Sequence, residues 1–184
     1  MNIALLGGAF NPPHLGHLEI AKQLLERKRV DEVWFVPTYQ DHHLRSAVVS
    51  SSDRVAMLES MLLPHMRVSL IEIDHTLDGK TIHLLPYLPK EHTYTFVIGA
   101  DWLASFQKWE QWEELLKAMA FLVIPRKGFL NEPLYTNMIV FHPIRDIPSI
   151  SATEIRRRVQ EKLPIDAFVP QKVAEYIKIH RLYI

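Results

Sequence analysis

The sequence predicts an α/β protein of the Rossmann-like, doubly wound kind, with a mostly parallel sheet that carries helices on both faces. Short apolar runs of strand length alternate with segments of helical spacing along the whole chain, and this alternation is typical of parallel strands joined by helical crossovers. The length of 184 residues, with 48% hydrophobic and 23% charged residues, suits one soluble domain with its own core. Both observations indicate the same fold class.

The first half of the chain contains two predicted crossovers. Apolar residues recur at helical spacing after the first strand, and Pro37 stops the apolar run that follows them. The next helix is expected to have Ser52 or Asp53 as its cap and to close before Pro64. The expected elements are strand 2–6, helix 15–28, strand 33–36, the capped helix, and strand 68–73.

The second half keeps the same alternation and contains more aromatic residues. Pro86 lies inside the first predicted helix, where it removes a backbone donor. Pro125 ends a predicted strand, and Pro164 and Pro170 separate the last two helices. The expected elements are helix 79–88, strand 94–98, short helices 102–106 and 110–117, strands 120–124 and 138–141, and helices 152–160 and 171–180.

The carboxyl ends of the predicted strands indicate where a ligand would bind. Open parallel sheets bind ligands beyond those ends, because the connecting loops gather there. In this chain the rule gathers residues 7–17, 37–45, 99–109, Arg126 and 149–156 along one edge of the sheet.

The segment after the first strand reads GGAFNPPHLGH and has the parts of an anion site. Gly7 and Gly8 let the backbone approach a ligand closely, and the two prolines stiffen the turn. A lone histidine more often serves packing, but His14 and His17 are three residues apart and can converge on one anion beside first-turn amides. Gly16 would weaken an ordinary helix by about 1 kcal/mol relative to alanine. We interpret it as space for a flat group such as an adenine ring.

A second segment, ISATEIR, places two hydroxyls at a helix start and an arginine one turn later. In one interpretation Ser151 is the N-cap and Glu154 completes a capping box. In the other, the free amides of the same first turn receive a phosphate, with Ser151, Thr153 and Arg156 beside it. The two interpretations are compatible, and both stay open.

Composition excludes several function classes. Lys and Arg together equal Asp and Glu, at 21 each, so no net field attracts a nucleic acid polymer. The chain has no cysteine, which rules out disulfides, thiolate catalysis and cysteine-based zinc sites and fits a cytoplasmic protein. The N-terminal run lacks the basic region of a secretory signal, and no segment approaches the roughly 20 apolar residues of a membrane span.

These segments resemble a known superfamily. GAFNPPHLGH resembles the (H/T)xGH signature of nucleotidyltransferases, and ISATEIR resembles their ISxTxIR segment. The strand that ends in Gly99 and Asp101, with Trp109 eight residues further on, is similar to the IGxD…W segment of bacterial nicotinate-nucleotide adenylyltransferases. The likeness covers essentially the whole chain. It implies a single nucleotidyltransferase domain over residues 1–184, whose C-terminal helical segment, about 151–184, completes an ATP site.

The resemblance implies transfer of the adenylyl group of ATP to nicotinate mononucleotide, with release of pyrophosphate, in NAD biosynthesis. The acceptor's phosphate is already an anion and needs no general base, so catalysis reduces to alignment and charge stabilisation. Mg²⁺ is expected to travel with ATP rather than in a metal site of the protein. The implied catalytic residues are His14 and His17. The residues implied for ATP are Gly8, Ala9, Phe10, Gly16, Asp101, Ser151, Thr153 and Arg156, and those implied for the acceptor are His43, Arg45, Thr81, Trp109 and Arg126.

Three of these residues also have structural interpretations. Asp101 would cap a helix ahead of Trp102. Trp109, expected to stack on the pyridine ring, would be a core residue between two amphipathic helices. Arg126, expected to pair with the mononucleotide phosphate, would be a surface residue beside Lys127.

Two loops depart from the family pattern, and both lie where the acceptor is expected. The PPHK-like loop of the family is QDHHLR here, which keeps His43 but replaces the lysine, so that Arg45 is left for the phosphate. The SYTxDT segment is reduced to residues 79–83, where Thr81 matches well. One alternative is therefore a sibling enzyme that uses nicotinamide mononucleotide, phosphopantetheine or another phosphorylated acceptor, with ATP or CTP. The other is a noncatalytic nucleotide-binding protein. Assembly into a homo-oligomer stays open.

Overall fold

The sheet of the protein, seen in a computed structural model that describes residues 1–39, 49–130 and 132–184, has six strands. Their order is β3-β2-β1-β4-β5-β6, and all five pairings between neighbours are parallel. The order reverses between β1 and β4, as in a doubly wound sheet, and the predicted fold class is confirmed. The strands are β1 Asn2–Gly8, β2 Glu32–Pro37, β3 Met66–Val68, β4 Thr93–Gly99, β5 Ala120–Ile124 and β6 Met138–Val140.

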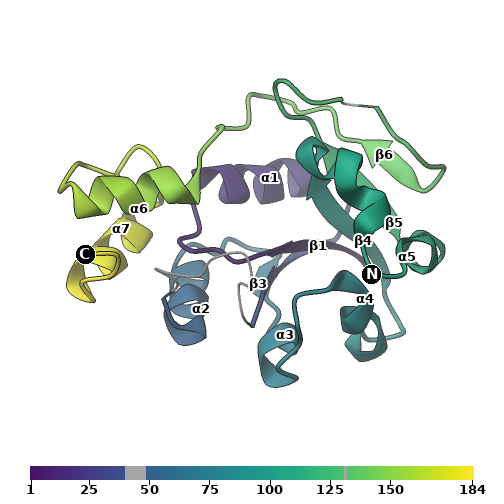
Figure 1. Cartoon of the computed structure of the whole chain (residues 1–184), viewed down its shortest axis with the longest axis horizontal. Helices are drawn as coiled ribbons and strands as arrows, with labels where there is room; N and C mark the ends of the chain where they lie inside the picture. Colours follow the sequence, from purple (N-terminus) through teal and green to yellow (C-terminus); the bar gives the residue numbers. More distant parts are fainter. Residues whose placement is uncertain (40–48, 131) are drawn as a thin grey trace.

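Helices cover both faces of this sheet, with α1 on one side and α3 and α4 on the other (Figure 1). The α-helices are α1 Leu15–Glu26, α2 Ser51–Ser60, α3 Ile71–Asp74, α4 Thr81–Leu84, α5 Trp112–Ala118, α6 Ala152–Gln160 and α7 Gln171–Ile179. Two 3₁₀ helices, η1 Leu85–Tyr87 and η2 Ala100–Lys108, complete the described elements. None of the helices in the described ranges is both long and apolar enough to span a membrane.

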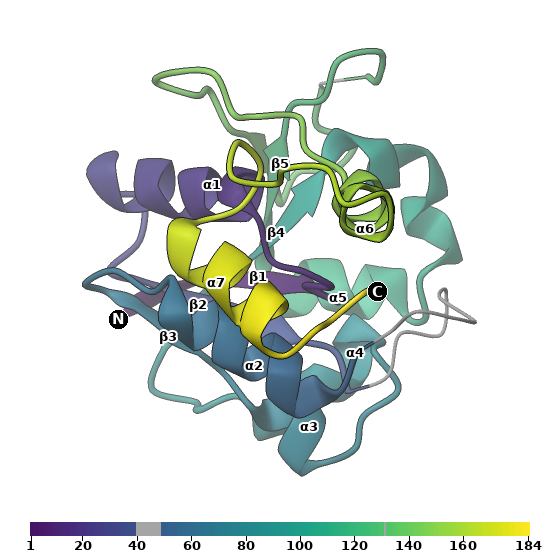
Figure 2. The same ribbon diagram turned by 90° about the vertical axis from the view of Figure 1, so that its left-hand side faces the viewer.

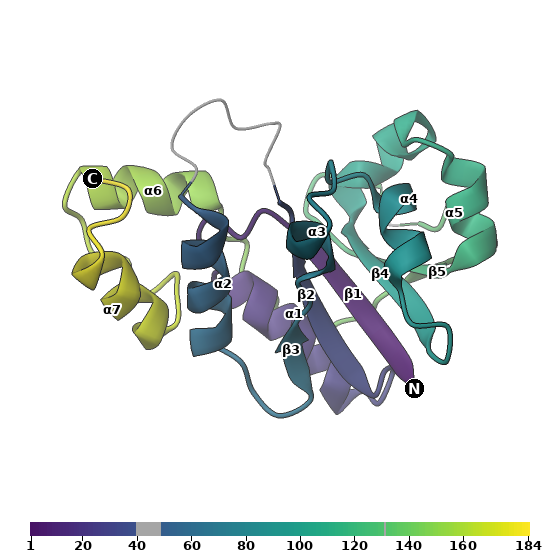
Figure 3. The ribbon, with the colours of Figure 1, turned by 90° about the horizontal axis from the view of Figure 1, so that it is seen from below.

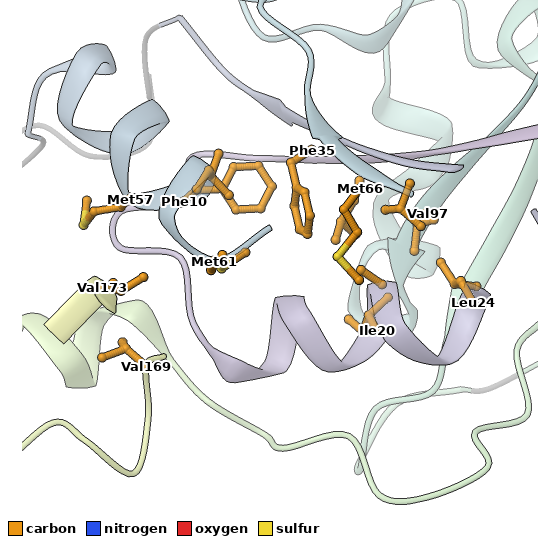
Figure 4. Packing of buried hydrophobic residues seen from close by; sticks show 14 of the residues in the cluster. Phe10, Ile20, Leu24, Phe35, Met57, Met61, Met66, Val97, Val169 and Val173 are labelled. Carbon is orange, nitrogen blue, oxygen red and sulfur yellow. The ribbon is translucent and has the colours of Figure 1, made fainter. Parts of the chain in front are cut away.

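Two hydrophobic cores hold the sheet from its opposite faces. Along β1, Ala4 and Leu6 face one core, while Ile3 and Leu5 face the other, as the alternation of a strand requires. Figure 4 shows the first core, to which Ile20 of α1, Phe35 of β2 and Met57 of α2 belong. Because β1 is buried on both faces, it fixes the start of the turn that follows it.

The C-terminal helices lie on the far side of the molecule from the N-terminus, where β1 begins (Figure 1). Figures 2 and 3 show α7 beside α2. Val173 and Ile177 of α7 join the same core as Met57 of α2, and the Tyr176 hydroxyl donates to Asp53 Oδ1 over 3.1 Å. The segment that follows residue 150 is therefore packed onto the first half of the fold.

The strand predicted at residues 68–73 is wrong. Strand β3 ends at Val68, and residues 71–74 form α3 instead. The Ser69 amide still donates to the Phe35 carbonyl over 2.8 Å, but Leu70 is exposed and the chain leaves the sheet there. An apolar run marks burial without specifying how far an edge strand follows its neighbour.

Helix boundaries also differ from the expectation. The helix predicted at 79–88 is a four-residue α4 followed by η1, because Pro86 has no amide to continue the ladder. Helix α5 starts at Trp112, since Gln111 has a left-handed φ of 51°. The cap of α2 is Ser50 rather than Ser52 or Asp53: the Asp53 amide donates to Ser50 Oγ over 3.0 Å.

Candidate active site

The two glycines at the end of β1 differ in their surroundings. A Cβ at Gly7 would lie 2.9 Å from the ring of Phe96, so Gly7 also has a packing role beside β4. A Cβ at Gly8 would meet the Phe10 ring at an ordinary 3.6 Å. Phe10 is 3% exposed and packs on Phe35, with a centroid distance of 5.7 Å. Its side chain belongs to the core, so only its backbone is available to a ligand.

Buried polar side chains from distant parts of the chain hold the same turn. Arg54 Nη1 donates to the Ala9 carbonyl over 2.7 Å, and Arg156 Nη1 donates to the Asn11 carbonyl over 2.7 Å. The Tyr183 hydroxyl donates to Asn11 Oδ1 over 2.8 Å. Asn11 and Arg54 are only 2% and 1% exposed, so these bonds are shielded from water. The turn is therefore preorganised before any ligand arrives.

Sequence reasoning missed Arg54 and Tyr183. The sequence does indicate that Arg54 is buried. It shares one helix face with the apolar residues Met57, Leu58 and Met61, which follow it at spacings of three, four and seven. A charged residue on an apolar face needs partners when it is buried. The link from Tyr183 to Asn11 joins positions 172 residues apart and has no local signal.

His14 and His17 converge as predicted. Their rings stack with a centroid distance of 3.6 Å and an interplanar angle of 18°, and His14 is the N-cap residue of α1. The His14 amide donates to His17 Nδ1 over 3.3 Å. Because Nδ1 of His17 accepts this bond, the proton of the neutral ring is on Nε2, which leaves Nε2–H as a donor.

Both histidines are held in the neutral form. Burial, followed by the nearby charge of Arg126, lowers the pKa of His14 to about 4. Burial, then the His14 ring and Arg126, keep the pKa of His17 well below its usual value. At neutral pH the pair thus offers N–H donors without a positive charge of its own.

We expect His14 to lower the stability of the protein as pH drops below about 6.5. The unfolded state protonates His14 first, so it binds more protons than the folded state between about 6.5 and 4, and the free energy of unfolding decreases with falling pH. The expected loss from His14 is about 2 kcal/mol at pH 5 relative to pH 7. Urea unfolding at both pH values should show a correspondingly smaller difference for His14→Asn. His142→Asn, at an exposed position, is the control, and an equal pH dependence in all three proteins would contradict the expectation.

Gly16 has a packing role that sequence reasoning did not identify. A Cβ there would lie 2.9 Å from the Pro148 carbonyl oxygen and 3.1 Å from His14 Nδ1. The expected space for a flat group is thus occupied by the chain segment that leads into α6. The absent side chain allows this segment to cross the start of α1.

The start of α6 tests the capping interpretation of ISATEIR. Ser151 is the N-cap residue, but its side chain makes no capping bond, and Glu154 pairs instead with Arg157 at 2.8 Å. The N-cap position of Ser151 is therefore confirmed, whereas the capping box with Glu154 is wrong. Thr153 Oγ1 accepts a bond from Arg156 Nη2 over 3.1 Å, and Arg156 is 8% exposed. This arginine links the first turn of α6 to the turn after β1.

Asp101 and Arg126 form an ion pair, with 2.7 Å between Oδ1 and Nε. Gly99, rather than Asp101, is the N-cap residue of η2, so the capping interpretation of Asp101 is wrong. A Cβ at Gly99 would collide with both partners of the pair. Arg126 is exposed, as expected for a surface residue. Its charge nevertheless helps to lower the pKa of His14 and of His17.

Trp109 is half-buried in an aromatic cluster, at centroid distances of 5.3 Å from Phe106 and 5.6 Å from Trp102. Trp109 therefore packs against other aromatic residues, as expected for a core residue, while part of its side chain stays accessible. Thr81 is buried at the start of α4. His43 and Arg45 lie outside the described residues.

Beside Trp109 lies a charged cluster that sequence reasoning missed. Lys80 Nζ is 3.1 Å from Asp78 and 2.9 Å from Glu110, while His83 contacts the same two carboxylates at 2.8 and 3.2 Å. The hydrogen bond to Asp78 raises the pKa of His83. The cluster ties the segment before α4 to the residue that follows Trp109, next to a cavity of about 670 Å³ lined in part by Asp78, His83 and Tyr87.

The chain is similar to known proteins over almost its whole length. The cytidylyltransferase-like family matches residues 5–158. A probable nicotinate-nucleotide adenylyltransferase of Oceanobacillus iheyensis is 35% identical, with 98% of this chain and 96% of the relative covered. The nicotinate-nucleotide adenylyltransferase of Bacillus subtilis is 33% identical, with 98% and 97% covered. The structure of Plasmodium falciparum nicotinic acid mononucleotide adenylyltransferase complexed with NaAD superposes with a TM-score of 0.81 over 99% of this chain and 97% of that chain, at 21% identity, and so supports the fold.

Proposed function

Because the chain belongs to the cytidylyltransferase-like family and, within it, to the nicotinate-nucleotide adenylyltransferases, we propose a mechanism by which its site transfers the adenylyl group. The donor is ATP, the acceptor is nicotinate mononucleotide, and the products are nicotinate adenine dinucleotide and pyrophosphate. The observation that carries the mechanism is the neutral, stacked pair of His14 and His17 at the start of α1.

To catalyse this reaction, the protein must align the two substrates and stabilise the negative charge that develops. The acceptor phosphate attacks the α-phosphorus of ATP as an anion, the bond to the leaving pyrophosphate breaks, and no proton has to be removed by a base. Negative charge develops on the phosphoryl oxygens during this step. We assign its stabilisation to Nε2–H of His17 and to His14, and the bond from the His14 amide holds the His17 ring in place before reaction.

For ATP we propose a clamp formed by the turn after β1 and the start of α6. The backbones of Gly8, Ala9, Phe10 and Gly16 line one side in this proposal, while Ser151, Thr153 and Arg156 lie on the other. The bond from Arg156 to the Asn11 carbonyl supports this arrangement, since it holds both sides together without ligand. In this proposal residues 151–184 complete the ATP site of a single domain, and Asp101 contacts the nucleotide.

Mg²⁺ is proposed to enter as part of the substrate MgATP. Within residues 1–39, 49–130 and 132–184, no group of three His, Asp or Glu side chains is placed to hold a metal ion. A magnesium ion that keeps most of its ligands from phosphates and water suits such a site. The ion would neutralise part of the triphosphate charge.

For the acceptor we propose that Trp109 stacks on the pyridine ring and Arg126 pairs with the phosphate. Thr81, His43 and Arg45 are proposed to complete this side. The accessible part of Trp109 and the nearness of Arg126 to the histidines support the first two roles.

Pyrophosphate release tests the substrate pair. Purified protein with Mg²⁺ and either ATP or CTP is assayed against nicotinate mononucleotide, nicotinamide mononucleotide and phosphopantetheine. We expect the highest kcat/KM with ATP and nicotinate mononucleotide. A higher value with another acceptor would overturn the acceptor but leave the reaction class, and no turnover with any pair would overturn both.

A further inference from the structure

We infer that Arg54 is a positioning residue that sets the distance between the turn that holds the donor and the segment that receives the acceptor. The inference rests on the proposed function, since it concerns the alignment of those two substrates. Arg54 itself reaches neither substrate in the proposed arrangement. It acts through the backbone carbonyls of two loops.

Arg54 bridges the carboxyl ends of β1 and β2. One guanidinium nitrogen donates to the Ala9 carbonyl over 2.7 Å, in the turn after β1. The other donates to the Thr38 carbonyl over 2.7 Å and to the Tyr39 carbonyl over 3.1 Å, directly after β2. His43 and Arg45, proposed for the acceptor, follow this second segment in the sequence. One side chain therefore holds both loops.

The free-energy cost of burying a charge indicates that Arg54 does more than stabilise the fold. Arg54 is 1% exposed and lies among the apolar residues of α2. A buried charge is tolerated only when its donors are satisfied, and an apolar residue of similar volume often gives equal or greater stability. Packing alone is therefore a weak reason for an arginine at this position.

The planar fork of arginine explains why this residue type suits the bridge. Its two terminal nitrogens reach two acceptors at fixed separation, whereas lysine offers a single point of attachment. Apart from Arg54, the Thr38 amide links the same two loops through a 3.0 Å bond to the Gly8 carbonyl. Arg54 adds a second connection further out, at Ala9 and Tyr39, and so limits how the loops tilt.

Alignment is where such a bridge acts on the reaction. In-line attack needs the acceptor phosphate within about 3–3.5 Å of the phosphorus, and a displacement of about 1 Å can cost about 100-fold in rate. Each substrate keeps its own contacts when the bridge is lost. We therefore expect kcat to fall more than the KM for ATP changes.

The test compares wild type with Arg54→Lys and Arg54→Met. We expect kcat to fall about 10-fold in both, with the KM for ATP and the KM for the acceptor each changed less than about threefold. Gln23→Met is the matched control. Gln23 is fully buried and bonds to the Arg145 carbonyl and the Ile144 amide, away from the turn, so this variant should lose stability but keep kcat.

Hydrogen exchange supplies a readout that does not depend on turnover. In Arg54→Lys we expect faster amide exchange at residues 8–11 and 38–39 than in wild type, with α1 unchanged. If neither variant folds, Arg54→Gln, which keeps a neutral donor, replaces them in both measurements.

Two results would overturn the inference: wild-type kcat and exchange in a folded Arg54 variant, or an equal loss of kcat in Gln23→Met. Failure of the proposed function is recognised separately, by a wild-type protein that prefers a different acceptor. The same comparison is then made with that acceptor. A wild-type protein with no turnover on any acceptor would overturn the inference as well.

Discussion

Replacement of His17 by alanine is expected to lower kcat by about 100-fold or more, with a change of at most about threefold in the KM for ATP. Nε2–H of His17 is held ready by the bond from the His14 amide to Nδ1 and is assigned to charge that develops only in the transition state. A donor of that kind contributes more to kcat than to substrate binding, because the ground state carries less charge at that oxygen.

Steady-state kinetics with saturating acceptor test this expectation. His142→Ala, at an exposed position distant in sequence from the pair, is the control and should behave like wild type. Thermal unfolding of His17→Ala should be measured in parallel, since the ring also packs against Phe10 at a centroid distance of 4.9 Å. Unchanged kcat in a folded His17→Ala protein would remove the catalytic role.

Replacement of Arg156 by methionine is expected to raise the KM for ATP by about 10- to 100-fold. The variant loses a charge-assisted bond to the Asn11 carbonyl and the cation proposed to meet the phosphates, and bonds of this kind contribute about 1.5–3 kcal/mol each. Methionine keeps much of the buried volume, so the change reports charge and hydrogen bonding more than packing.

The neighbouring Arg157 provides a matched control for this measurement. It lies on the same helix but is exposed and pairs with Glu154 and Glu161. Arg157→Met should leave the KM for ATP near the wild-type value. Equal effects of the two substitutions would mean that the general charge of α6, rather than the buried position of Arg156, determines ATP binding.

The parts of the fold that could be predicted are those with dense local signals. Strands β1, β4 and β5 are buried on both faces and therefore appear as continuous apolar runs. Strand β3 was misplaced because an edge strand has one neighbour, and its length depends on how far β2 pairs with it. The start of α5 depends on a left-handed residue, Gln111, that no composition rule marks.

The same distinction separates the predicted from the missed residues of the site. His14, His17 and Arg156 lie in short motifs whose spacing places them on helix starts. The sequence marks Gly16 as unusual in a helix but does not show why a glycine is needed there. The reason is the contact with Pro148, which is 132 residues away in the sequence. Contacts of this range arise from tertiary packing, and a single sequence does not encode them in any local pattern.

The bonds that converge on residues 9–11 have a consequence for the order in which the protein assembles. Their partners stand at positions 54, 156 and 183, so the turn acquires its final shape only after most of the chain has been brought together. The strand pairings of the sheet span shorter stretches than the bonds to Arg156 and Tyr183, and the longest of them joins Asn2 to Thr93. Loss of enzymatic activity is thus a more sensitive sign of incipient unfolding than loss of secondary structure.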